Sequence, residues 1–546
     1  MSLTSSVPSP SEVQATYCAT LVDEWLALGL SDAVVCPGSR STPLALALAE
    51  RSELRLHVRL DERSAAFFAL GVALASGRPV LLLVTSGTAA AEVHAAVCEA
   101  DLSSVPLIVV TADRPPELHG VGAPQTIDQA GLFGRVVREA GDPGVARLEV
   151  SSSWRPLARR LWRRSRGEGT TPGPVHLNAA FIEPLVASAG NLPRRVDTEA
   201  MTISPERVTL SLGGRRVLVV AGARSDRESV SQLLSAGAAL VGDVTVVDAL
   251  SHADVLVRDG ALAAELRPDL VIRLGGLPSS KVLGQRLREW AAPTISVRGV
   301  DEPADPDGLS DVVTRGRVEI AEGDRANEEY ATRWRTLSEA VVQGLQTVER
   351  WCEPVVAGDV AREAKESARA LVVGSSMPVR DVEWWASDRP ERVFSNRGAN
   401  GIDGVVSTLC GVASVTPALG LVGDLTMLHD VSALVEGCPS GSATLVVLDN
   451  GGGGIFSFLS QRSVLDENRF EQLFGTPRTH DLVTVARAFS HHAERVETRE
   501  HLRDALQSSR HRPGLSIIVA ALPSRDENVE THTWLLERAT EWTRSW

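Results

Sequence analysis

The sequence predicts an α/β protein with three doubly wound parallel-sheet domains. The chain has 546 residues, which is too long for a single hydrophobic core. Short apolar runs that end at glycine or polar residues alternate with longer amphipathic stretches, as in parallel α/β layers. The alternation forms three blocks, residues 11–185, 209–320 and 354–546, and the stretch 186–208 is expected to be a linker.

The first block contains four apolar runs that are expected to be strands: Asp32–Cys36, Val80–Thr85, Leu107–Thr111 and Val175–Asn178. Helices are expected between them, including Ser64–Ala75, Thr88–Asp101 and the arginine-rich amphipathic stretch Trp154–Arg166.

The second and third blocks repeat this pattern. In the second, the expected strands are Val217–Val220, Val244–Val247, Leu270–Leu274 and Thr294–Val297. In the third, they are Ala370–Gly374, Arg392–Ser395, Ala418–Val422, Thr444–Leu448 and Leu515–Ala520. The stretch Leu425–Cys438 has helical character, so it and its two flanking strands are expected to form a βαβ unit.

Composition excludes several classes of protein. Hydrophobic residues make up 43% of the chain and charged residues 23%, as in globular proteins, and no apolar stretch reaches the roughly 18 residues of a membrane span. The net charge of −14 argues against a nucleic-acid surface. The six cysteines form no C-x-x-C pair, and Met1–Pro10 is expected to be a short tail rather than a signal peptide. We therefore expect a cytoplasmic protein.

Polar residues follow two neighbouring strands of the third block. Asp424 ends one apolar run, and Asp449-Asn450 followed by four glycines ends the next. Ligands of open α/β sheets bind at the carboxyl ends of the strands, and hard oxygen donors suit Mg²⁺. Glycines allow backbone to approach a diphosphate closely. The pair predicts a magnesium-diphosphate site, although the glycine run alone is equally typical of a flexible loop.

Turns after strands of the first block can also bind anions. Cys36-Pro-Gly-Ser-Arg-Ser-Thr-Pro43 offers backbone N–H groups, hydroxyls and a guanidinium, and Thr85-Ser-Gly-Thr88 offers a similar turn facing an anion or a cofactor. The alternative is helix capping by their hydroxyl groups, and both roles can hold at once. Glu62 is expected in the first turn of a helix, where a lone carboxylate usually complements the helix dipole.

Several cationic side chains are expected near strand ends. Arg114 and Gln125 lie in a long polar loop of the first block, and Arg380 and Arg397 follow strands of the third. Lys281 is one of two lysines in a chain that otherwise uses arginine. Arginines in an acidic protein favour small anionic substrates, because a guanidinium pairs with a carboxylate in a bidentate manner.

These motifs together resemble thiamine-diphosphate-dependent enzymes. The segments Cys-Pro-Gly-Ser-Arg-Ser-Thr-Pro-Leu, Thr-Ala-Asp-Arg-Pro-Pro-Glu-Leu, Ser-Asn-Arg-Gly-Ala-Asn-Gly-Ile-Asp-Gly and Gly-Gly-Gly-Ile-Phe-Ser-Phe-Leu resemble the 2-succinyl-5-enolpyruvyl-6-hydroxy-3-cyclohexene-1-carboxylate synthase family of menaquinone biosynthesis. The resemblance spans nearly the whole chain. It implies a pyrimidine-binding domain (11–185), a central α/β domain (209–320) and a diphosphate-binding domain (354–546).

The resemblance also implies a reaction and a cofactor. With thiamine diphosphate and Mg²⁺ or Mn²⁺, 2-oxoglutarate is decarboxylated and the resulting carbanion adds 1,4 to isochorismate. Glu62 would hydrogen-bond the aminopyrimidine ring as the catalytic group. Residues that match cofactor-binding positions are Glu62, Thr85, Ile402, Asp424, Asn450, Gly452 and Phe456, of which Asp424, Asn450 and Gly452 would ligate the metal. Residues that match substrate-binding positions are Ser39, Arg40, Arg114, Gln125, Lys281, Ser376, Arg380 and Arg397.

The cofactor fingerprint differs from the wider enzyme class at two positions. Leu425 replaces a glycine, which supports the narrower family, and Asp449 adds a carboxylate whose direction the sequence leaves open. The resemblance implies a homodimer or a dimer of dimers with Glu62 and Asp424 meeting across the subunit interface. Two other hypotheses remain: another thiamine-diphosphate-dependent 2-oxoacid decarboxylase or carboligase, and a non-catalytic diphosphate-binding regulator.

Overall fold

The computed structural model describes residues 7–196, 206–298, 305–439, 441–544 and 546. The chain folds into two compact units. The first contains Met1–Thr202 with Arg397–Asn400 and Cys410–Val415, and the second contains the remainder. Parts of the expected tail and linker, residues 1–6 and 197–205, lie outside the described residues.

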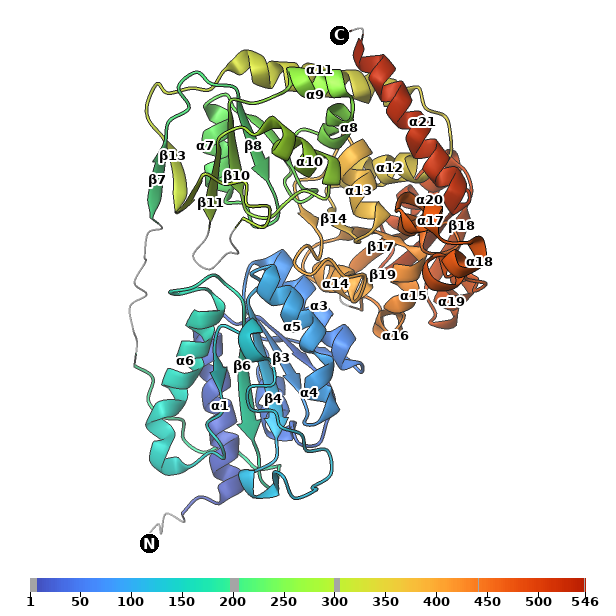
Figure 1. Cartoon of the computed structure of the whole chain (residues 1–546). Coiled ribbons are helices and arrows are strands. Elements are labelled where there is room, and N and C mark those ends of the chain that lie inside the picture. The colour runs from blue at the N-terminus through green and yellow to red at the C-terminus, as the bar shows by residue number, and fades with distance from the viewer. Residues whose placement is uncertain (1–6, 197–205, 299–304, 440, 545) are drawn as a thin grey trace. The chain divides into compact units, whose positions relative to one another are not determined.

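The first unit is built around a six-stranded parallel sheet with the order β2-β1-β3-β4-β6-β5 (Figure 1). Its strands are β1 (Asp32–Val35), β2 (Arg55–Val58), β3 (Val80–Val84), β4 (Leu107–Asp113), β5 (Ala140–Gly141) and β6 (Pro174–Ala180). The four strands expected in this block are confirmed, and they are buried on both faces, which explains their continuous apolar character. The two-residue strand β5 was not predicted.

Helices cover both faces of this sheet. They are α1 (Pro10–Leu28), α2 (Thr42–Ala49), α3 (Glu62–Ser76), α4 (Thr88–Glu92), α5 (His94–Leu102) and α6 (Trp154–Ser165). One hydrophobic core joins α1, α2 and α6 to alternate strand residues such as Leu81 and Leu83. Leu82 and Val84, also buried, alternate with them and face the other layer. The expected helix over Thr88–Asp101 is present but is divided between α4 and α5.

The second unit contains two larger parallel sheets and one two-stranded parallel sheet. The five-stranded sheet has the strand order β12 (Val312–Arg315), β11 (Thr294–Arg298), β10 (Leu270–Leu274), β8 (Val217–Ala221) and β9 (Ala239–Gly242). The six-stranded sheet has the strand order β15 (Val393–Phe394), β14 (Ala370–Val373), β16 (Ala418–Gly423), β17 (Ser442–Asp449), β19 (Gly514–Ala521) and β18 (His492–Val496). Strands β7 (Arg207–Leu210) and β13 (Arg317–Ile320) form the small sheet. The predicted α/β class with doubly wound parallel sheets is confirmed.

One predicted strand is wrong. Val244–Val247 forms a turn, and the strand in this part of the chain is β9, Ala239–Gly242. The Asp243 side chain accepts hydrogen bonds from the Thr245 backbone N–H at 2.9 Å and from its hydroxyl at 2.7 Å, which folds the chain back after the strand. Val244 and Val246 are nevertheless buried, so a buried turn produces the apolar pattern of a strand.

The helices of the second unit include α7 (Arg227–Ser235), α8 (Ala253–Arg258), α9 (Gly260–Glu265), α10 (Lys281–Trp290), α11 (Glu328–Gln346), α12 (Glu353–Glu366), α13 (Met377–Trp385), α19 (Leu482–Ala488), α20 (Arg499–Ser509) and α21 (Arg525–Arg544). Helix α14 (Val405–Ala413) begins in this unit and ends among the residues grouped with the first. The expected helix over Leu425–Cys438 consists of α15 (Asp424–His429) and α16 (Ala433–Glu436). Two further short helices are α17 (Gln461–Val464) and α18 (Glu467–Phe470).

One core of the second unit packs its five-stranded sheet against helices that contact the six-stranded sheet. It contains Leu218 and Val241 from the five-stranded sheet, Trp334 from α11, Trp385 from α13 and Leu535 from α21. This shared core explains why both sheets belong to one compact unit, and the division into three domains at the expected boundaries stays a prediction. Among the described residues no helix is long and apolar enough to cross a membrane.

Candidate functional site

Glu62 is the first residue of α3 and is partly buried there. The preceding residue, Asp61, performs the capping: its side chain accepts a hydrogen bond from the Ser64 backbone N–H at 2.7 Å. Burial raises the pKa of Glu62, and the charges of Asp61 and Glu92 raise it further. The helix start already has a carboxylate in Asp61, so Glu62 is a candidate for proton chemistry rather than for capping.

The turn after β1 packs tightly against the turn after β3. A Cβ atom at Gly38 would lie 2.3 Å from Cβ of Thr85, so only glycine allows the two turns to approach this closely. The Thr85 hydroxyl is buried and has no hydrogen-bond partner among the described residues. A buried hydroxyl without a partner costs free energy, and a bound ligand would remove that cost.

The hydroxyls of the first turn do not cap α2. Ser41 donates to the Gly38 carbonyl at 2.9 Å and Thr42 donates to the Ser39 carbonyl at 2.7 Å, and the N-cap of α2 has no side-chain hydrogen bond. These two hydroxyls therefore fold the turn instead of stabilising the helix start. The capping alternative is wrong for this turn, and also for Thr88, because α4 has Gly87 at its N-cap without a side-chain bond.

Two guanidinium groups lie near these turns. Arg114 Nη1 donates to Ser86 Oγ and to the Gln125 carbonyl at 2.8 Å, and Gln125 Nε2 donates to the Ser86 carbonyl at 2.9 Å. Arg40 Nη1 donates to the Phe181 carbonyl at 3.0 Å. Burial lowers the pKa of Arg114, and the positive charge of Arg40 lowers it further. The structure thus brings Arg114 and Gln125 together at the turn at residues 85–88, and Arg40, which also lies 3.4 Å from Glu183, is close enough to act on Arg114 through its charge. A pair of guanidinium groups is suited to an anion.

A buried polar network holds these turns in place, and sequence reasoning missed it. The Gly87 backbone N–H donates to Gln129 Oε1 at 2.8 Å, and Gln129 Nε2 donates to Asn178 Oδ1 at 2.9 Å. Asn178 Nδ2 in turn donates to Asp113 Oδ2 at 2.9 Å. The available signal was two amide side chains, one of them within the buried strand β6.

Asp424 and Asn450 lie at the carboxyl ends of two neighbouring central strands in the second unit's six-stranded sheet. Strands β16 and β17 are parallel neighbours with Gly423 paired to Leu448, so both side chains follow the carboxyl ends of adjacent strands. Asp424 is 4% exposed, and its Oδ1 accepts from the Leu425 backbone N–H at 2.7 Å. Burial raises the pKa of Asp424 to about 7, and the negative charge of Asp449 adds to this rise. A cation would compensate this buried carboxylate.

The Asn450 amide is oriented by hydrogen bonding. Its Nδ2 donates to Glu353 Oε1 at 2.7 Å, while its Oδ1 is buried and has no partner among the described residues. A Cβ atom at Gly454 would lie 2.5 Å from Nδ2, so the glycine provides room for the amide. The oxygen of Asn450 is therefore available to a ligand and its nitrogen is occupied.

The glycine run is packed rather than loose. Gly453 N–H donates to the Gly475 carbonyl at 2.8 Å, and a Cβ atom at Gly452 would lie 2.2 Å from the same carbonyl oxygen. Gly452 has a φ of 141°, which favours glycine over other residues. The flexible-loop alternative is wrong, because this backbone is fixed by the segment that contains Gly475.

This donor set fits a hard divalent cation. It combines the Asp424 carboxylate, the orphan Asn450 Oδ1 and the backbone of Gly452, and Mg²⁺ prefers such oxygen ligands with phosphate and water completing its shell. No group of three or more His, Cys, Asp or Glu side chains within the described residues could hold a metal by itself.

The remaining residues of the predicted site lie at several places in the structure. Phe456, in the 3-10 helix Gly454–Phe458, packs against Phe474 with ring centroids 5.4 Å apart. Ser376 precedes α13, and its carbonyl accepts from Arg380 Nη1 at 2.5 Å. Ile402 is partly buried ahead of α14, and Lys281 is exposed as the first residue of α10, beside the five-stranded sheet. Arg397 belongs to the segment grouped with the first unit, where it hydrogen-bonds Asn400.

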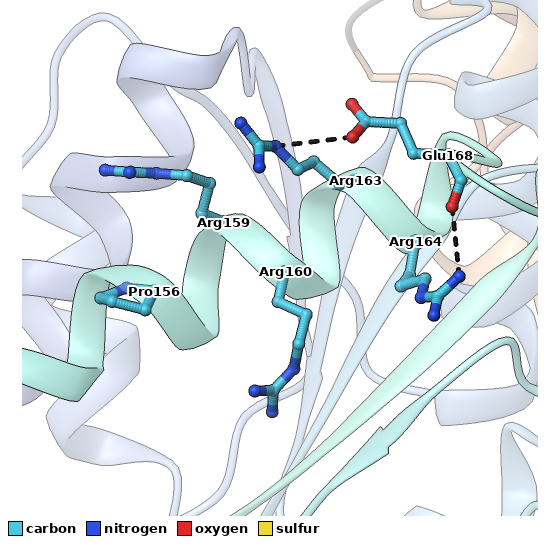
Figure 2. A pocket seen from close by; sticks show the side chains of 6 residues that line it. All are labelled: Pro156, Arg159, Arg160, Arg163, Arg164 and Glu168. Carbon is cyan, nitrogen blue, oxygen red and sulfur yellow. Dashed lines mark hydrogen bonds and ion pairs between the residues drawn. The ribbon is translucent and has the colours of Figure 1, made fainter. Parts of the chain in front are cut away.

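A separate hollow lies along α6 and carries little promise as a site. Figure 2 shows its lining residues, Pro156, Arg159, Arg160, Arg163, Arg164 and Glu168. Its arginines already have partners: Arg163 lies 3.5 Å from Glu168, Arg160 and Arg164 pair with Glu139, and Arg159 pairs with Glu24. The charge that would attract an anion is therefore largely compensated.

Two regions of the chain match models of known protein families. Residues 16–132 match the model described as thiamine pyrophosphate enzyme, N-terminal TPP binding domain, and residues 376–520 match the corresponding C-terminal TPP binding domain. A 2-succinyl-5-enolpyruvyl-6-hydroxy-3-cyclohexene-1-carboxylate synthase of Geobacillus thermodenitrificans is 37% identical, covering 96% of each chain. The chain belongs to this synthase family.

Other relatives with the same name agree. The synthase of Bacillus velezensis is 36% identical over 96% of this chain and 97% of its own, and that of Thermobifida fusca is 39% identical over 89% and 92%. The resemblance found in the sequence motifs is confirmed, and the chain is a thiamine-diphosphate-dependent enzyme of the synthase family. The roles of individual residues stay predictions.

Proposed function

We propose that this synthase-family enzyme decarboxylates 2-oxoglutarate and joins the remaining four-carbon fragment to isochorismate in menaquinone biosynthesis. Carbon dioxide leaves, a proton is taken up, and the product is 2-succinyl-5-enolpyruvyl-6-hydroxy-3-cyclohexene-1-carboxylate. The observation that carries the proposal is the pair of buried oxygen ligands, Asp424 and the unpartnered Asn450 Oδ1, at the ends of adjacent strands. The names of the relatives give the product, and the resemblance of the motifs implies the two substrates.

Thiamine diphosphate is the proposed cofactor, with Mg²⁺ or Mn²⁺ bridging it to the protein. Asp424, Asn450 and the Gly452 carbonyl would hold the metal, Thr85 and Glu62 would face the pyrimidine half, and Ile402 and Phe456 would provide apolar walls. When bound, the cofactor supplies the electron sink that decarboxylation requires.

Glu62 is proposed as the proton-handling group. Its partial burial raises its pKa, and a raised pKa would favour its role as a proton donor to a ring nitrogen of the cofactor. The neighbouring Asp61 is committed to the Ser64 backbone N–H and is not available for this purpose. Among the carboxylates at the start of α3, Glu62 is therefore the one suited to the reaction.

The substrates are polyanions, and cationic groups would position them. Arg40 and Arg114 already lie close enough together to lower the pKa of Arg114, and an anion between them would relieve their repulsion. Ser39, Gln125, Lys281, Ser376, Arg380 and Arg397 are proposed to complete the substrate sites. This need for several cations favours dicarboxylate substrates over pyruvate.

The active site is proposed to form between two subunits of a homodimer or a dimer of dimers. The first unit of one subunit would contribute Glu62, and the second unit of its partner would contribute Asp424. All six cysteines are free thiols, which supports a reducing cytoplasm as the place of action.

The reaction can be tested with the purified protein. We expect isochorismate consumption when 2-oxoglutarate, thiamine diphosphate and Mg²⁺ are all present, and its loss when EDTA removes the metal. The decrease in isochorismate absorbance and the release of carbon dioxide measure the two halves of the reaction. Turnover of pyruvate without consumption of isochorismate would instead establish the rival function, a different 2-oxoacid decarboxylase or carboligase.

A further inference from the structure

A buried acidic residue lies directly behind the proposed metal ligand Asn450. Glu353 is the first residue of α12 and is only 1% exposed. Its Oε1 accepts the hydrogen bond from Asn450 Nδ2 at 2.7 Å. Burial of a carboxyl group costs free energy of folding unless hydrogen bonds compensate it, and the Asn450 amide provides such a bond.

Two further buried titratable groups, Asp381 and His532, act on Glu353 through their charges. His532 on α21 lies with Nε2 2.7 Å from Asp381 Oδ1 and with Nδ1 2.9 Å from the Asn528 carbonyl. Asp381 on α13 is fully buried, and its negative charge acts on Glu353, while Glu353 Oε2 and Asp381 Oδ2 have no hydrogen-bond partner among the described residues. Glu353, Asp381 and His532 thus form a buried cluster of titratable groups from three helices, and Glu353 is the member that is hydrogen-bonded to the Asn450 amide.

The direction of that amide decides whether Asn450 can bind a cation. An amide offers an oxygen acceptor on one side and an NH₂ donor on the other, and the two have nearly the same shape. Without a fixed acceptor, the group can turn by half a rotation and present its NH₂ to the metal. Glu353 Oε1 provides this acceptor, and the structure leaves Asn450 Oδ1 buried and unpartnered among the described residues.

We propose that Glu353 is a positioning residue that holds Asn450 with its oxygen toward the divalent cation. The inference rests on the proposed function, because it assumes that Asn450 ligates the metal. Outer groups of this kind commonly change metal affinity by about 10- to 100-fold when they are removed.

Two substitutions at Glu353 separate positioning from charge. Glu353→Leu removes the acceptor at similar volume, so we expect Mn²⁺ to bind about 10- to 100-fold more weakly in the presence of saturating thiamine diphosphate. Glu353→Gln keeps an acceptor for Asn450 and gives Asp381 a donor, so we expect it to retain the wild-type affinity for Mn²⁺. Free Mn²⁺ measured by electron paramagnetic resonance provides the affinities without any turnover.

A matched control lies on the same helix. Glu363 is also buried on α12, but its carboxylate pairs with Arg369 at 2.8 Å and Arg510 at 2.7 Å, away from Asn450. We expect Glu363→Gln to lower thermal stability and to leave Mn²⁺ affinity unchanged. Circular dichroism of each variant checks that a weakened affinity belongs to a folded protein, and Glu353→Gln keeps the test informative if Glu353→Leu does not fold.

A double-variant cycle provides the decisive outcome. If Glu353 acts through Asn450, Glu353→Leu weakens Mn²⁺ binding in the wild type but has no further effect in an Asn450→Ala background. Equal effects in both backgrounds, or a Glu353→Leu variant that binds Mn²⁺ as tightly as the wild type, would overturn the positioning role. Failure of the wild type itself to bind Mn²⁺ with thiamine diphosphate would instead reject the proposed metal site.

Discussion

Arg495 on the edge strand β18 donates a hydrogen bond to Asp449 Oδ2 at 3.3 Å. Asp449 ends β17, and β19 lies between these two strands, so the Asp449 carboxylate reaches across the sheet edge. Its negative charge still raises the pKa of Asp424. Asp449 is therefore an ion-paired neighbour of the proposed metal site rather than a further ligand.

This ion pair predicts a modest electrostatic effect on cofactor binding. Arg495→Gln leaves the Asp449 charge uncompensated near the proposed diphosphate position, and we expect thiamine diphosphate affinity to fall about two- to fivefold, as for an exposed pair. Asp449→Asn removes that charge and should maintain or raise the affinity. Quenching of tryptophan fluorescence during a thiamine diphosphate titration measures both. An equal loss in the two variants would show that Asp449 binds the metal directly.

Glu62→Gln is expected to abolish turnover while the cofactor still binds. The amide keeps the shape of the side chain but cannot hold or release the proton, and loss of a proton-transferring group costs about 10²- to 10⁴-fold in rate. Steady-state consumption of isochorismate measures the rate, and fluorescence titration measures cofactor affinity.

The adjacent residue provides the control for Glu62. Asp61→Asn should retain near-normal turnover, because asparagine caps a helix about as well as aspartate does. Near-normal activity of Glu62→Gln would contradict the proton-handling role, whereas inactivity of both variants would indicate damage to the start of α3.

Mixed dimers test whether the active site spans two subunits. Glu62→Gln and Asp424→Ala are each expected to be inactive alone. A dimer that contains one copy of each has one fully wild-type site if the two residues come from different subunits. Refolding an equal mixture should therefore restore about a quarter of wild-type activity, since about half of the dimers are mixed and have one working site each. A mixture that stays inactive would place both residues in one subunit.

Two buried histidines predict loss of stability in mild acid. Burial lowers the pKa of His176 and of His252 to about 4, below the usual 6.5. The unfolded chain takes up these protons as the pH falls below 6.5, whereas the folded chain takes them up only near 4. Stability is therefore greatest above pH 6.5 and is lost as the pH falls from 6.5 toward 4. At pH 5 each histidine lowers the free energy of unfolding by up to about 2 kcal/mol relative to its value above pH 6.5.

Thermal unfolding at pH 7.5 and pH 5 checks this prediction. His252→Gln should reduce the difference between the two melting temperatures, because the neutral amide does not titrate. The exposed His511 offers a control, and His511→Gln should leave the difference as it is in the wild type. A His252→Gln variant with the full wild-type difference would mean that other groups cause the acid sensitivity.

The sequence predicted the central strands because each is a continuous apolar run buried on both faces. It also predicted the placement of Asp424 and Asn450, since residues that follow neighbouring parallel strands lie at one sheet edge whatever the surroundings. Among the edge strands that escaped prediction, β12 has two exposed valines and β18 has exposed and buried residues in irregular order. The turn at Val244–Val247 was mistaken for a strand because burial, rather than strand geometry, selects apolar residues.

The local sequence thus determined the fold class, the family motifs and the kinds of groups that follow each strand. Only the tertiary structure decided which partners those groups have. Glu353 and Asn450 are 97 residues apart in the chain, and Arg495 and Asp449 are 46 residues apart. No periodic pattern connects such positions, because hydrogen bonds and ion pairs depend on distances of a few ångströms that arise only when separate helices and strands pack together.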